Sequence, residues 1–184
     1  MKERVLQSCI ELFNQKGLKF TMDDVAKHMG MSKKTLYTIF EDKQTLFLEM
    51  VDYLFASIQE SKKSVINNPN LSTVEKIQLI LGVMPESYKQ IDFRQLYSLK
   101  DKYPKTYKRV EKHLENGWED TIALFEQGIK EGVIRPVSIP LVKMMLEASL
   151  EQFFQRDILI QNGLSYQEAL NEVVKIIIDG ICMK

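Results

Sequence analysis

The sequence predicts an all-α protein of about nine helices arranged in two domains. Three observations predict this fold class. Apolar residues recur at helical spacing along nearly the whole chain; Gly, Pro and Asn residues separate the periodic stretches; and Ser or Thr precedes several of them as an N-cap. With 45% hydrophobic residues among its 184, the chain has enough apolar material for one or two cores.

The first three helices are short, and residues that favour helix ends mark them. An apolar stripe over residues 5–13 predicts a helix that Gly17 ends. Thr21 is the expected N-cap of the second helix, and Asp24 at the N3 position completes a capping box. Ser32 is the expected N-cap of the third helix, so a turn of about three residues joins two short helices.

Two longer helices are predicted next. Residues 42–66 read as one helix, which the polar run at residues 67–70 breaks. A further apolar stripe over residues 74–88 steps by three and four residues, although Pro85 should kink or end that helix.

The C-terminal half continues the helical pattern. Pro104 can open a helix whose apolar stripe extends without a break to near Gly132. The last pair is predicted over residues 139–162 and 165–181, the second one capped by a Ser with Glu at N3. The β-branched run at residues 173–178 could read as a strand, but its capped, helical context favours a helix.

Charge and composition narrow the classes of function. The 25 Lys and Arg residues balance the 25 Asp and Glu residues, so any contact with nucleic acid must be local. No apolar run approaches the roughly 18 residues of a membrane span and no signal-peptide core is present, so we expect a cytoplasmic protein without a membrane partner. Cys9 and Cys182 lack a CxxC spacing, so we expect two buried thiols and no disulfide, metal or other cofactor.

Residues 21–40 have the pattern of a helix-turn-helix, whose second helix enters the major groove of DNA. The side chains expected to face inward are Val25, Ala26, Met29, Leu36, Ile39 and Phe40. Outward-facing ammonium and hydroxyl groups suit phosphates and base edges, and they belong to Lys33, Lys34, Thr35, Tyr37 and Thr38. Lysines alone would also fit a solvated surface. The two-helix spacing favours the DNA-binding interpretation.

The string from Thr35 to Lys43, Thr-Leu-Tyr-x-x-Phe-x-x-Lys, is the most specific motif in the chain. Here the sequence resembles the tetracycline-repressor (TetR) family of bacterial transcriptional regulators. The resemblance is close over the first 50 residues. It is weaker at residues 128–136, which are similar to a segment that precedes the dimerisation helices of the family.

The resemblance implies a set of DNA-binding residues. Tyr37 and Lys43 would contact phosphates, and the whole predicted set is Thr21, Lys33, Lys34, Thr35, Tyr37, Thr38 and Lys43. A phosphate would give Lys43 a reason to lie at the start of a helix, where the helix dipole disfavours a cation. Many family members have a glycine near Lys34, so the lysine leaves the base preference open.

The resemblance also implies a homodimer, because one recognition helix discriminates weakly and such regulators read palindromes. The last two helices have more apolar residues than a single narrow stripe needs, so we expect them to pair as a four-helix bundle, with a monomer core as the alternative. The predicted interface residues are Leu146, Phe153, Phe154, Val174, Ile177, Ile178 and Ile181, with Leu141, Val142 and Met145 as further apolar positions.

A small-molecule effector is the other implied partner, and its pocket is expected within residues 71–132. Aromatic and methionine side chains there are of the type that lines apolar cavities, although each would also suit a core. The candidates are Met84, Tyr88, Tyr97, Trp118 and Phe125. The identity of the effector cannot be read from these residues.

We therefore expect a transcriptional regulator, in the first instance a repressor, that binds double-stranded DNA through residues 1–46. Residues 47–184 would bind the effector and dimerise, and the effector would select a state with the wrong spacing between the two DNA-binding domains. A helical ligand-binding protein with a vestigial DNA-binding domain is the alternative. An enzyme is disfavoured because His28 and His113 stand apart and no HExxH, phosphate loop or Gly-x-Ser-x-Gly motif is present.

Overall fold

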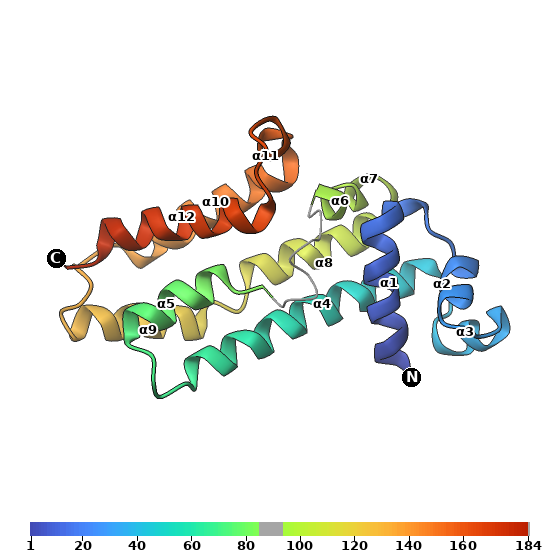
Figure 1. The fold of residues 1–184 in the computed structure, drawn as a ribbon, viewed down its shortest axis with the longest axis horizontal. Helices are drawn as coiled ribbons and strands as arrows, with labels where there is room; N and C mark the ends of the chain where they lie inside the picture. The colour runs from blue at the N-terminus through green and yellow to red at the C-terminus, as the bar shows by residue number, and fades with distance from the viewer. Residues whose placement is uncertain (85–93, 184) are drawn as a thin grey trace. The chain divides into compact units, whose positions relative to one another are not determined.

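A computed structural model describes residues 1–84 and 94–183, and these residues are helical almost throughout (Figure 1). The predicted all-α class is confirmed, since the β structure of the described residues is limited to an isolated bridge between Ile134 and Cys182. The chain divides into two compact units. Unit 1 comprises Met1–Ala56 and Ile91–His113, and unit 2 comprises Ser57–Gln90 and Leu114–Lys184. Unit 1 therefore contains more of the chain than the residues 1–46 of the expected N-terminal domain.

Unit 1 is built on a cluster of aromatic side chains. Phe47 makes edge-to-face contacts with Phe13, Phe20 and Tyr103, with ring centroids 5.9, 5.2 and 4.8 Å apart. Its elements are α1 (Lys2–Lys16), the 3-10 helix η1 (Gly17–Lys19), α2 (Met22–His28), α3 (Lys33–Ile39), the start of α4 (Lys43–Ile66), α6 (Arg94–Tyr97), α7 (Leu99–Lys102) and most of α8 (Pro104–Glu115).

Unit 2 packs α5 against both α9 and α12, and α10 against α12. Its elements are the end of α4, α5 (Thr73–Gly82), α9 (Glu119–Lys130), α10 (Ile139–Gln155), α11 (Ile158–Gln161) and α12 (Tyr166–Ile181). Its apolar core includes Ile77, Phe125, Leu146, Val174 and Ile178, each at most 5% exposed. Figure 1 shows α10 and α12 running alongside each other.

The predicted helix starts agree with the structure where a side-chain cap marks them. Thr21 and Ser165 each form the predicted capping box with an acidic residue at N3, and Ser32 accepts a hydrogen bond from the Thr35 N–H. Ser72 forms a further capping box at the start of α5, which was not predicted from the sequence. The β-branched run at residues 173–178 lies within α12, so the helix prediction was correct.

Two predicted helices were too long. The stripe from Pro104 to Gly132 is divided into α8 and α9 at Gly117, whose φ of 76° is in the left-handed region that favours glycine. The helix predicted to reach residue 162 ends at Gln155, where the extended backbone of Arg156 begins a break before the single turn of α11. The stripe over residues 74–88 supports a helix only to Gly82, and residues 85–93 lie outside the described residues.

The two cysteines are free. Burial raises the pKa of the Cys9 thiol to about 12, as expected for a buried thiol, whereas Cys182 is only partly buried. Within residues 1–84 and 94–183, none of the helices combines the length and the apolar character that crossing a bilayer would require.

Candidate nucleic-acid interface

The crossing of α2 and α3 is fixed by side chains buried between them and the rest of unit 1. Four of the six side chains predicted to face inward, those of Val25, Ala26, Leu36 and Phe40, are at most 4% exposed. The other two, Met29 and Ile39, are only half-buried. The turn between the helices is closed by a 2.9 Å hydrogen bond from the Met31 N–H to the Ala26 carbonyl. Gly30 adopts a φ of 63° in this turn.

The outward side of α3 carries the side chains predicted for DNA contact. We call Lys33, Lys34, Thr35, Tyr37 and Thr38 the recognition face, and all five are exposed. Tyr37 is 44% exposed, so its phenol is accessible to a partner. The structure therefore brings these five residues together on one exposed helix.

The polar groups of the recognition face differ in their availability. The Lys33 ammonium pairs with Asp23 at 3.0 Å, and that hydrogen bond raises the pKa of Lys33. The Thr38 hydroxyl donates to the Thr35 carbonyl at 2.6 Å, which holds it against the helix. Lys34 has no ion pair within the described residues. Its charge is therefore the one on this face that no carboxylate compensates.

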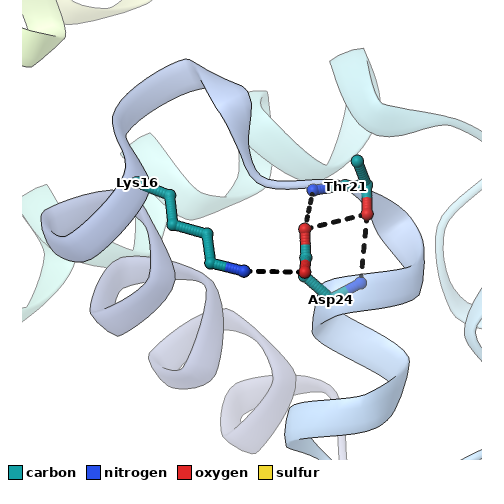
Figure 2. Close-up of polar contacts among 3 residues, drawn as sticks. All are labelled: Lys16, Thr21 and Asp24. Atoms are coloured by element: carbon teal, nitrogen blue, oxygen red, sulfur yellow. Dashed lines mark hydrogen bonds and ion pairs between the residues drawn. The ribbon is translucent and has the colours of Figure 1, made fainter.

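Thr21 lies at the N-cap of α2, where its polar groups serve the helix (Figure 2). Its hydroxyl accepts from the Asp24 N–H at 3.1 Å, and Asp24 accepts from the Thr21 N–H at 2.7 Å. Lys16, at the end of α1, donates to the same carboxylate at 2.7 Å. The Lys16 ammonium, followed by the Thr21 groups, holds the pKa of Asp24 well below its usual range. One carboxylate thus joins the end of α1 to the start of α2.

Lys43 has an internal role in this structure. Its ammonium donates to the Leu18 carbonyl at 2.8 Å and lies 4.9 and 5.2 Å from the ring centroids of Phe20 and Phe47. Burial, followed by repulsion from Lys102, lowers the pKa of Lys43. These contacts explain a lysine at this helix start without a phosphate. Its contact with DNA stays a prediction from the resemblance.

Neither histidine stands apart from other polar groups. His28 Nδ1 is 2.6 Å from the Ser8 hydroxyl, which links α2 to α1. His113 Nε2 is 2.6 Å from an Asp52 carboxylate oxygen, and the imidazole stacks on Phe55 at 4.6 Å between ring centroids. Both contacts join helices within unit 1, so the histidines contribute to its packing.

The predicted dimer-interface residues lie mostly inside one chain. Six of them are at most 7% exposed: Leu146, Phe154, Val174, Ile177, Ile178 and Ile181; Phe153 is half-buried. Buried side chains leave little area for a partner. The same two helices instead expose Leu141, Met144, Met145 and Ile176 by 55–62%, a set that we call the apolar face. Sequence periodicity pointed to Leu141 and Met145 but missed Met144 and Ile176.

The predicted effector residues are divided between the two units. Tyr97 belongs to unit 1, whereas Met84, Trp118 and Phe125 belong to unit 2. Phe125 is 1% exposed in the unit 2 core, and the Trp118 indole donates to the Leu114 carbonyl at 3.0 Å. Met84 and Tyr97 are half-buried, and Tyr88 lies outside the described residues. Their role in binding an effector stays untested.

A short turn between two helices with a shared buried core, and exposed lysine and hydroxyl groups on the second helix, define a helix-turn-helix DNA-binding domain. Residues 5–50 match the family model of the bacterial regulatory proteins of the tetR family. The N-terminal part of the chain therefore matches the DNA-binding domain of this family of regulators, as the sequence resemblance predicted.

Two curated relatives agree with this assignment. An uncharacterised helix-turn-helix transcriptional regulator of Bacillus subtilis, YvaF, is 25% identical over 98% of this chain and 95% of its own length. The Staphylococcus aureus negative regulator of the biofilm operon icaADBC, IcaR, is 34% identical over 56 residues, 30% of each chain.

Solved structures share the whole fold. A TetR transcription regulator of Haloarcula marismortui has a TM-score of 0.75 at 17% identity, covering 99% of this chain and 98% of that one. The Bacillus subtilis regulator FadR in complex with stearoyl-CoA has a TM-score of 0.68 at 15% identity, covering 98% and 100%. These likenesses show the fold.

Proposed function

We propose that the protein is a repressor that binds a palindromic DNA operator as a homodimer and leaves it when a small-molecule effector binds. The recognition face carries this proposal, because it presents an uncompensated ammonium, an exposed phenol and hydroxyl groups on one side of a buried two-helix core. Repression is supported by the name of the IcaR relative, a negative regulator. Operators lie in the cytoplasm, so the proposal implies that location.

The residues of the recognition face would contact different parts of the DNA. Lys34 is the side chain best suited to a guanine edge or a phosphate, since no carboxylate within the described residues competes for it. Tyr37 would contact a phosphate through its exposed hydroxyl. Thr21 and Lys43 would contribute less from their side chains, because those are engaged in the α2 cap and with the Leu18 carbonyl.

Dimerisation would use the apolar face of α10 and α12. This face exposes four large apolar side chains on neighbouring helices, each by more than half. Exposure of so much apolar surface to water is unfavourable in free energy. A second copy related by a two-fold axis would bury the same four side chains on both chains. This proposal keeps the two predicted helices and changes the residues at the interface.

The effector would bind within residues 47–184, and its binding would alter the spacing of the two DNA-binding domains. The acyl-CoA bound to FadR is a property of that neighbour, and it supports here only the capacity of the fold to hold a small molecule. Among the predicted residues, Phe125 fits the core better than a pocket, while Met84 and Trp118 remain candidates.

Selection of bound duplexes from a random DNA pool, near physiological salt, tests the proposal. We expect an enriched inverted repeat, and we expect Tyr37→Ala to weaken binding to it while the helical content is unchanged. If no repeat is enriched, even after unfolding and refolding to remove a copurified ligand, the DNA-binding proposal is wrong. The alternative, a helical binding protein with a vestigial DNA-binding domain, would then be favoured.

A further inference from the structure

Two acidic residues are adjacent in the first turn of α2, and their carboxylates have different partners. Asp24 accepts from the Thr21 N–H and from the Lys16 ammonium, each at 2.7 Å, so it serves the helix cap and the contact with α1 (Figure 2). Asp23 instead pairs with the Lys33 ammonium of α3 at 3.0 Å. The α2 cap is therefore complete without Asp23, whose carboxylate is directed to the recognition face.

The Asp23–Lys33 pair lies at the surface that the proposed function turns toward DNA. The side chains of Asp23 and Lys33 are 56% and 52% exposed, so other ions can reach both of them. In a helix-turn-helix the first helix crosses the DNA backbone and the second enters the major groove. A carboxylate in the first turn of α2 would thus approach phosphates, which repel it. The pair places one negative charge among the groups that would attract DNA.

This pair contributes little to folding. Ion pairs between exposed side chains stabilise a fold only slightly, because the charges stay hydrated in the unfolded chain and the side chains lose freedom when they pair. The crossing of α2 and α3 depends instead on buried side chains such as Val25 and Leu36, which are both 0% exposed. The main effect of the pair is therefore expected on the charge that α3 presents to DNA.

Pairing with Asp23 reduces what Lys33 can contribute to phosphate binding. Proteins bind DNA of any sequence mainly because their lysines and arginines displace condensed counterions from phosphates. A lysine that a carboxylate already neutralises displaces fewer counterions, since it must exchange one anionic partner for another. Lys34 has no ion pair within the described residues, so its ammonium keeps this capacity. The two neighbouring lysines thus differ in their expected contribution to binding.

We propose that Asp23 is a specificity-determining residue, which limits binding to DNA of arbitrary sequence by holding the Lys33 ammonium. Base contacts distinguish an operator, whereas phosphate contacts are available on every duplex. A regulator must find few operators among a very large number of competing sites, so weak phosphate binding favours occupancy of the operator. This inference rests on the proposed function, because it concerns how the recognition face binds DNA.

Fluorescence anisotropy of a labelled duplex pool of random sequence, at several NaCl concentrations, tests the inference. For each chain bound, Asp23→Asn should tighten binding about fivefold to tenfold near 0.1 M salt, because one ammonium becomes free for a phosphate. The slope of log affinity against log salt should steepen by about one per chain. The amide keeps the size of the carboxylate, and a gain in affinity cannot result from a loss of folded protein.

A double-mutant cycle separates the pair from a general effect of charge. Lys33→Gln should weaken binding by about twofold or less in the parent, where Asp23 holds the ammonium, and by about fivefold or more in Asp23→Asn. The matched control is Glu41→Gln, which removes an exposed carboxylate two residues beyond the end of α3. This control should change the affinity by about twofold or less, because Lys33 remains paired and exposed charges are screened by salt.

Three results would overturn the inference. The first is an affinity of Asp23→Asn that is equal to or weaker than that of the parent. The second is an equal gain in Asp23→Asn and Glu41→Gln, which would show a general effect of negative charge. The third is an equal loss from Lys33→Gln in both backgrounds, which would show that the two residues act independently.

These failures can be told apart from a failure of the proposed function. In each of the three the parent binds the duplex pool, so DNA binding by the recognition face still stands. A parent that binds no duplex at any salt concentration would instead contradict the proposed function, and this inference with it.

Discussion

The recognition face and the apolar face both lie on exposed sides of helices, yet they differ in chemistry. α3 buries Leu36 completely and exposes ammonium and hydroxyl groups. α10 and α12 bury nine apolar side chains between them and still expose Met145 and Ile176 by 58 and 62%. The buried side of a helix identifies the fold, whereas the exposed side identifies the chemistry of a partner. A polar face suits nucleic acid, and an apolar one suits another protein surface.

The largest effect is expected from a charge placed on the apolar face. Met145→Glu should split the proposed dimer, because an unpaired carboxylate would be desolvated at its centre. The mass measured by light scattering should fall to the 21.5 kDa of one chain. Affinity for a palindromic operator should fall by about 100-fold or more, since one half-site remains in contact.

The matched control for this charge is Ala123→Glu, at an exposed position of α9. It should leave both the mass and the affinity unchanged. If Met145→Glu also leaves the mass unchanged, the apolar face is not the dimer interface, and the comparison between the two faces would need another explanation.

The next largest effect concerns close packing in the core of unit 2. A Cβ atom at Gly128 would lie 2.8 Å from the Ile134 Cδ1 atom, so Gly128→Ala should lower the free energy of unfolding by about 1–3 kcal/mol. Gly180 has open space around it within α12, so Gly180→Ala should raise that energy by about 0.5–1 kcal/mol. Urea denaturation measures both, and effects of the same sign would contradict the packing described here.

On the recognition face, Lys34→Ala should weaken operator binding about tenfold and reduce the salt dependence by about one phosphate contact. Fluorescence anisotropy at several salt concentrations measures both quantities. Lys130→Ala, which removes an exposed lysine from α9, serves as the control and should change neither. A Lys34 variant that behaves like this control would mean that α3 contacts DNA through other groups.

Sequence reasoning succeeded where a helix end is determined locally. The Thr21 and Ser165 capping boxes involve residues three positions apart, and the chain shows both partners directly. The recognition face could be predicted for a similar reason, because seven consecutive residues of α3 present a simple inward and outward division.

The failures involve packing between distant segments. The helical spacing of apolar residues continues across Gly117 and therefore predicts one helix, although the chain turns at this glycine and forms two helices. Periodicity likewise indicated that α10 and α12 are apolar, but it could not tell which of their apolar sides would be buried in the core of unit 2 and which would remain exposed. The internal role of Lys43 depends on the Leu18 carbonyl 25 residues away, and no local pattern reveals it.

The smallest expected effect concerns acid. Because its folded-state pKa lies below the unfolded value, Asp24 adds stability above about pH 4, and that stability is lost as the pH falls through the folded value. Asp24→Asn should therefore be less stable than the parent at neutral pH, and the difference should shrink at about pH 3. Urea denaturation at the two pH values measures this. Asp179→Asn, which removes an exposed carboxylate from the last turn of α12 that caps no helix, serves as the control, and its difference from the parent should change less between the two pH values.

The contacts of Asp24 and Lys43 also have a consequence for engineering. Designers who exchange the DNA specificity of regulators often wish to transplant a recognition helix by itself. Here Asp24 at the start of α2 pairs with Lys16 of α1, and Lys43 at the start of α4 donates a hydrogen bond to the Leu18 carbonyl of η1. A transplant of α2 and α3 alone would lose both contacts. The smallest portable cassette in this protein therefore extends from α1 through the first turn of α4.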